Sequence, residues 1–115
     1  PVLQDADVVV IASPVYWFTV TAQTKLFMDR CYARVDADAY SLSNKEIGIV
    51  MTYGDSDPFD SGAVNALRTF QDGFSYAGSE IVGMVYGSAS DPGEIANNAE
   101  VTAQAYALGQ KLAGG

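Results

Sequence analysis

The fold of this 115-residue chain is decided by the stretch from Val8 to Phe18, which reads Val8-Val9-Val10-Ile11-Ala12-Ser13-Pro14-Val15-Tyr16-Trp17-Phe18. Its first four residues are all β-branched and form a continuous apolar run. Such a run predicts a strand buried on both faces, as in a parallel sheet covered by helices. Pro14 lacks the N–H that a central strand needs, so we expect the chain to turn at Ser13-Pro14.

The rest of the chain alternates between apolar runs and segments with helical periodicity. The expected strands are Val8–Ile11, Ile47–Met51 and Glu80–Tyr86, and the expected helices are Thr21–Ala33, Ala63–Tyr76 and Glu94–Ala113. The connections between strands are long enough for right-handed crossovers. The sequence therefore predicts one α/β domain over residues 1–115, with a parallel sheet.

Each expected helix has a face that we predict to be buried. The spacing favours Ala22, Leu26 and Phe27 in the first helix and Ala63, Leu67, Phe70 and Phe74 in the second. In the third it favours Ile95, Ala99, Ala103, Tyr106 and Leu112, with Asp91 as the cap and Pro92 at the first helical position.

Composition excludes several classes of function. The chain carries 14 acidic and 6 basic residues, a net charge of −8, which argues against a nucleic-acid surface or an anionic membrane surface. No apolar run approaches the ~20 residues of a membrane-spanning helix. Histidine is absent, and Cys31 is the single cysteine, so we expect neither a metal site nor a catalytic triad. These features favour a cytoplasmic protein.

Three loops should share one edge of the sheet, because each follows a parallel strand. They are Ser13–Phe18, Thr52–Asp57 and Gly87–Asp91. The first offers aromatic faces, and the second offers backbone N–H groups, a glycine and hydroxyl groups. Together they suit a planar ring that is stacked and also hydrogen-bonded at its edge. The alternative is that these loops are ordinary turns.

Three motifs resemble those of a known family. They are Ala12-Ser13-Pro14-Val15-Tyr16, Ala22-Gln23-Thr24-Lys25 and Phe27-Met28-Asp29-Arg30. They look like the signature of the flavodoxin-like NADPH-dependent FMN reductases, which include iron–sulfur flavoproteins and multimeric flavodoxin-type quinone reductases. Thr52-Tyr53-Gly54-Asp55 is similar to the second flavin loop of that family, and Ala107–Leu112 is typical of its last helix.

The resemblance implies that the three expected strands are the third, fourth and fifth of a five-stranded sheet ordered 2-1-3-4-5. The chain would then be the C-terminal part of a flavodoxin-like domain, lacking the loop that holds the FMN phosphate; the start at Pro1, without Met, agrees with this. The Val8–Ile11 strand would have a bare edge, so we expect self-association into a homo-oligomer.

The resemblance also implies FMN as cofactor and NAD(P)H as co-substrate. The residues carried over as flavin contacts are Ser13, Pro14, Val15, Tyr16, Trp17, Phe18, Thr52, Tyr53, Gly54 and Asp55. The alternative for the aromatic residues is a dimer interface, and for Asp55 a solvent-facing position. No catalytic acid or base is expected, because the cofactor carries out the chemistry of hydride transfer.

The function implied is that of an FMN-dependent NAD(P)H oxidoreductase, which passes electrons to a small-molecule acceptor such as a quinone or a flavin. One alternative is a flavodoxin-type electron carrier, for which the acidic surface could steer basic partners. The other is a non-catalytic fragment that self-associates as an interaction module.

Overall fold

The computed structural model describes residues 2–114, and its elements follow one another in a β/α pattern. They are α1 (Val2–Asp5), β1 (Val8–Tyr16), β2 (Thr19–Val20), α2 (Ala22–Arg30), β3 (Glu46–Tyr53), α3 (Ala63–Tyr76), β4 (Glu80–Ser88), the 3-10 helix η1 (Glu94–Asn97) and α4 (Ala99–Leu112).

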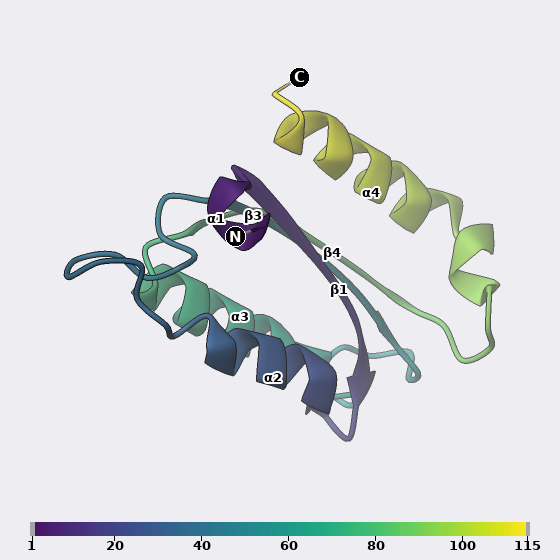
Figure 1. The fold of residues 1–115 in the computed structure, drawn as a ribbon. Coiled ribbons are helices and arrows are strands. Elements are labelled where there is room, and N and C mark those ends of the chain that lie inside the picture. The colour runs from purple at the N-terminus through teal and green to yellow at the C-terminus, as the bar shows by residue number, and fades with distance from the viewer. Residues whose placement is uncertain (1, 115) are drawn as a thin grey trace.

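The sheet has the order β2-β1-β3-β4. Strands β1, β3 and β4 are parallel, with Ile11 beside Ile49 and Ile49 beside Met84, whereas β2 pairs antiparallel with the end of β1. Helices α2 and α3 cover one face and α4 covers the other (Figure 1). The α/β class is confirmed, but the sheet is mixed and has four strands among residues 2–114, where three were expected.

The expected turn at Ser13-Pro14 is wrong. Strand β1 continues through Pro14, which lies beside Thr52 of β3, and the chain turns only at Trp17-Phe18. Proline is tolerated here because, within the described residues, β1 has β3 on one side and meets β2 only at Val15 and Tyr16 on the other. The N–H that Pro14 lacks therefore removes little hydrogen bonding from the sheet at this edge.

Helix α3 matches its predicted bounds and carries the main core. Ala66, Phe70 and Phe74 are buried in one cluster with Ile47, Ile49 and Met51 of β3, and Ala63 at the start of the helix is buried as well. The rings of Phe70 and Phe74 stack with their centroids 5.7 Å apart. Leu67 is only partly buried, and Ala66 occupies the more central position. Gly78, with φ +82°, follows the end of the helix as predicted.

Helix α2 is shorter than predicted, and its buried face is different. Thr21 caps it by accepting a hydrogen bond from the Thr24 N–H at 3.1 Å. Leu26 is 60% exposed, whereas Phe27 and Met28 pack on the core. Lys25 and Asp29 form a surface ion pair at 2.5 Å.

The predicted last helix is broken into η1 and α4. Asn98, rather than Asp91, caps α4 by accepting from the Val101 N–H at 3.2 Å. The predicted face is confirmed at Leu112, which is buried, and wrong at Tyr106, which is 70% exposed. Leu108, which was not predicted, is the other buried residue of α4. Ala99 and Ala103 are also exposed. The leucines are buried because they lie over glycines of the sheet, Leu108 over Gly83 and Leu112 over Gly48.

The outer edge of β1 has no strand beside Val8–Pro14 within the described part of the chain. Val10 is 56% exposed there, and a groove runs between this edge, α1 and Phe27 of α2. Self-association through this edge stays a prediction. Among residues 2–114, no helix has the length and apolar character needed to cross a bilayer.

Candidate functional site

A cleft of about 500 Å³ opens where β1, β3 and β4 end at the same edge of the sheet. The strand arrows of Figure 1 point to this edge. Its lining comes from Pro14–Tyr16 of β1, from Thr52–Gly54 at the end of β3, and from Ala89–Gly93 and Ile95 beyond β4. Three loops far apart in sequence therefore form one site, as parallel strands require.

The second and third loops are joined by hydrogen bonds. The Ala89 N–H donates to the Tyr53 carbonyl at 2.8 Å, and the Ser90 hydroxyl donates to the Gly54 carbonyl at 3.0 Å. These bonds hold the two loops together, so this wall of the cleft is set before any ligand arrives.

The Glu94 carboxylate organises the third loop. Its Oε2 accepts hydrogen bonds from the N–H groups of Asp91, at 2.9 Å, and Ser90, at 2.7 Å. These bonds hold the pKa of Glu94 below its ordinary value. Because both N–H groups are already bonded to Glu94, they are not free to bind a ligand.

Two glycines leave room for a flat ligand beside the backbone. A Cβ placed on Gly54 or on Gly93 would meet no heavy atom within 4 Å. Gly93 also has φ +80°, a conformation that favours glycine. Gly54 and Gly93 lie in different loops of the cleft, so a planar group can come close to the backbone of both loops.

The polar groups in the cleft are neutral or acidic. Tyr53 is 8% exposed, and burial, followed by the nearby Tyr86 and Asp57, raises the pKa of its phenol. Tyr53 is therefore protonated at neutral pH. No lysine or arginine is among the lining residues, whereas Asp91 is. The cleft suits a planar polar ring better than a phosphate group.

The turn between β1 and β2 is strained and strongly exposed. Trp17 has φ 49° and Phe18 has φ 70°, so both occupy the left-handed region that a two-residue hairpin of this type requires. That conformation costs about 1–2 kcal/mol for each bulky residue. Trp17 is nonetheless 90% exposed, and its ring meets that of Phe18 edge-on at 5.5 Å. Strain at exposed aromatic residues suggests a functional requirement.

The structure brings together six of the ten predicted site residues: Pro14, Val15, Tyr16, Thr52, Tyr53 and Gly54. Ser13 is buried and donates its hydroxyl to the Pro14 carbonyl at 2.9 Å. Trp17, Phe18 and Asp55 lie outside the lining of the cleft. Ala89–Gly93 and Ile95 were missing from the predicted set, although the sequence placed the loop Gly87–Asp91 at the same edge.

A second cavity, of about 460 Å³, lies at the opposite ends of α2 and α3. Its lining includes Cys31, Tyr32, Tyr40 and Tyr76 and shares no residue with the cleft. Burial raises the pKa of the Cys31 thiol, as expected for a cysteine that serves as a small core residue. Within residues 2–114, no group of three acidic, cysteine or histidine side chains is placed to hold a metal ion.

Comparison with known proteins agrees with this architecture. Residues 2–112 match the Flavodoxin_2 family, described as having a flavodoxin-like fold. The iron-sulfur flavoprotein of Archaeoglobus fulgidus is 44% identical over 52 residues, which are 45% of this chain and 26% of that protein. The structure of the Trp repressor binding protein from Bacillus subtilis superposes with a TM-score of 0.77 at 26% identity, covering 93% of this chain and 65% of that one.

The chain thus spans about a quarter of the curated relative and 65% of the solved structure. The family match itself extends over all of the strands and helices of the described residues. This chain belongs to the Flavodoxin_2 family and has its flavodoxin-like α/β fold.

Proposed function

We propose that the cleft binds the isoalloxazine ring of FMN, and that the protein is an NAD(P)H oxidoreductase passing electrons to a quinone, a flavin or a similar small acceptor. The observation that carries the proposal is the cleft itself, in which three loops meet around two glycines with open space beside them. Family membership and the 44% identity to an iron-sulfur flavoprotein support a flavin as the ligand.

The proposal includes the branch of the family and the place of the strands. Strands β1, β3 and β4 would be the third, fourth and fifth of a sheet ordered 2-1-3-4-5, as in the NADPH-dependent FMN reductases that the sequence resembles. The pairing of β1 with β3 and of β3 with β4 has the neighbours that this order requires.

Each wall of the cleft would have a separate task. Tyr16 offers an aromatic face at the end of β1. Thr52 and the protonated Tyr53 offer hydroxyl groups on the second loop, and Gly54 and Gly93 allow the ring to approach the backbone. When bound, the flavin would supply the redox chemistry, and these residues would orient the ring and shield it from water.

The proposal assigns only the ring to these residues. A phosphate needs cations or free N–H groups, whereas the cleft has no lysine or arginine and the N–H groups of Ser90 and Asp91 already bind Glu94. The FMN phosphate therefore has no proposed ligand among the residues of this cleft.

One observation favours the electron carrier as a second candidate. Asp55, Asp57 and Asp91 are exposed beside the cleft, and their charge would repel the phosphates of a dinucleotide while attracting a basic protein partner. Steady-state oxidation of NADH or NADPH with a quinone present separates the two. Turnover supports the oxidoreductase, and FMN binding without turnover supports the carrier.

The first experiment is a titration of FMN with the 115-residue chain, followed by quenching of flavin fluorescence. The variant Gly54→Leu fills the open space beside the second loop and should weaken binding at least tenfold. Gly109→Leu is its matched control, because Gly109 also has open space around it but lies on α4, outside the cleft. Absence of quenching by the unaltered chain, or equal affinity in both variants, would contradict the proposal.

A further inference from the structure

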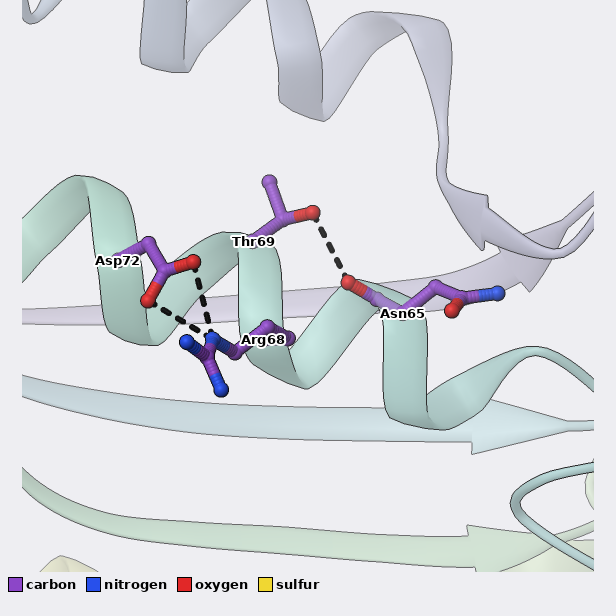
Figure 2. A network of polar contacts seen from close by, with 4 residues as sticks. All are labelled: Asn65, Arg68, Thr69 and Asp72. Atoms are coloured by element: carbon purple, nitrogen blue, oxygen red, sulfur yellow. Dashed lines mark hydrogen bonds and ion pairs between the residues drawn. The ribbon is translucent and has the colours of Figure 1, made fainter.

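The Trp17-Phe18 turn is fixed from outside the hairpin by the first turn of α3. The Asn65 side chain donates from Nδ2 to the Phe18 carbonyl at 3.1 Å, across 47 residues of sequence. Asn65 lies in the first turn of α3. Figure 2 shows its carboxamide directed away from Thr69 and from the ion pair of Arg68 with Asp72. Its side chain is therefore available to the hairpin rather than to its own helix.

Gly62 provides the second contact of α3 with this turn. A Cβ on Gly62 would lie 2.3 Å from the Phe18 Cα and 2.5 Å from the Phe18 oxygen. These are backbone atoms, which cannot rotate away. Gly62 also has φ +85°, so the position favours glycine on conformational grounds as well. The backbone of Phe18 is thus packed directly on the backbone that begins α3.

The base of the hairpin is held independently. Val20 of β2 is 6% exposed and belongs to the main core, and it pairs with Val15 of β1. A two-residue antiparallel pairing alone is weak, because an isolated hairpin is marginally stable in water. The tip carries two bulky residues in a conformation that they disfavour, so it needs an added constraint to stay in place.

We propose that Asn65 is a positioning residue, which holds the Trp17-Phe18 turn in its left-handed conformation and so fixes Tyr16 and Trp17 beside the cleft. The consequence for flavin affinity rests on the proposed function, whereas the effect on the hairpin does not. Asn65 supplies the hydrogen-bond donor to the Phe18 carbonyl, and Gly62, which has no side chain, lets the backbone of the turn pack directly on the start of α3.

The chain contains a direct probe of this turn. Trp17 is the single tryptophan, so its fluorescence anisotropy reports the local motion of the hairpin tip together with the tumbling of the whole molecule, and the matched control has the same tumbling. The test variant is Asn65→Asp, which keeps the shape of the side chain but replaces the donor by a carboxylate that faces the Phe18 carbonyl. An acidic residue in the first turn of a helix is favourable, so α3 itself should not be weakened.

The matched control is Thr69→Val. It removes the hydrogen bond from the Thr69 hydroxyl to the Asn65 carbonyl, at 2.9 Å, one turn further along the same helix (Figure 2). This bond does not reach the hairpin. We expect the anisotropy of Trp17 to fall in Asn65→Asp and to stay unchanged in Thr69→Val, with similar melting temperatures for the two variants.

The cofactor titration adds a second readout. A net hydrogen bond of ordinary strength corresponds to a change of about fivefold, so FMN should bind about fivefold more weakly to Asn65→Asp than to Thr69→Val. Unchanged anisotropy in Asn65→Asp would overturn the positioning role, whatever the FMN result. If the unaltered chain binds no FMN, the proposed function fails, and the anisotropy still decides the role of Asn65.

Discussion

Helices α3 and α4 have 14 residues each and cover opposite faces of the same sheet, yet they pack in opposite ways. Helix α3 brings the bulk itself, with Phe70 and Phe74 inserted over the large side chains of β3. Helix α4 instead places Leu108 and Leu112 over Gly83 and Gly48, where the sheet provides holes. The spacing of apolar residues in a helix reveals its buried face when large helix side chains fill the core, as in α3. It is a poorer guide when the buried face is selected by glycines in the sheet beneath the helix, as in α4.

The largest effect should come from removing bulk on the α3 side. Phe70 is fully buried and stacked on Phe74, so Phe70→Ala should lower the free energy of unfolding by about 3–5 kcal/mol through the cavity it leaves. Urea denaturation measures this. A loss below that of Leu108→Ala would show that the α3 face is not the main core.

The second effect concerns Gly62, which packs against backbone atoms, in contrast to Gly83, which packs against a side chain. Gly62→Ala would drive a Cβ into the Phe18 backbone at a positive φ, and we expect a loss of about 2 kcal/mol or more. The Trp17 emission should change at the same time, because the hairpin must move. A variant with unaltered stability and emission would disprove the close backbone contact.

The third effect tests the holes beneath α4. Gly83→Ala would place a Cβ 2.7 Å from Leu108 Cδ1, which is the end of a flexible side chain. The leucine can rotate, so the cost should stay near the lower end for overpacking, about 1 kcal/mol. The double variant Gly83→Ala with Leu108→Ala should be more stable than the sum of the two single losses predicts. Simple additivity would argue against direct packing.

The fourth effect concerns Tyr106 of α4, which the sequence wrongly predicted to be buried. Tyr106 is 70% exposed, so Tyr106→Ala should change the free energy of unfolding by no more than about 0.5 kcal/mol. Leu108→Ala, two residues later, should cost about 2 kcal/mol. Thermal unfolding of both variants compares the two faces. If Tyr106→Ala lowered the free energy of unfolding more than Leu108→Ala, the side of α4 that carries Tyr106 would be the buried one, as predicted from the sequence.

The smallest effect concerns the segment that leads into α4. The pKa of Glu94 is lowered by its bonds to the Asp91 and Ser90 N–H groups. Its stabilising contribution is therefore present above the ordinary carboxyl pKa and is lost as the pH falls through the lowered one. Carbon-13 NMR of the side chain should show titration below the ordinary glutamate range, and Glu94→Gln should remove this part of the acid dependence. A normal Glu94 titration would contradict the loop geometry.

The strands and α3 were predictable because their signals are local: continuous β-branched runs, and apolar residues at helical spacing ended by Gly78. The hairpin was missed because Pro14 suggested an end to the strand, and because two-residue turns of this type usually carry Asn or Gly rather than Trp and Phe. Their strain is balanced by contacts from Gly62 and Asn65, which are distant in sequence. No local rule could show that balance.

The candidate site was predictable to the extent that topology fixes it. Parallel strands place Thr52–Gly54 and Pro14–Tyr16 at one edge, as the sequence indicated. The contribution of Pro92, Gly93 and Ile95 was missed, because it depends on where the last helix begins. Ile95 of η1 lines the cleft, whereas a single helix from Glu94 was expected there.

The glycine holes beneath α4 also restrict how this sequence can evolve. Gly48 and Leu112, Gly83 and Leu108, and Gly87 and Val101 each form a small–large pair between the sheet and a helix. A larger residue at one member is accommodated better when the other becomes smaller, so paired substitutions at these sites cost less stability than single ones. In an alignment of relatives, these pairs should therefore covary, and the register of α4 on the sheet should be recoverable from sequence variation alone.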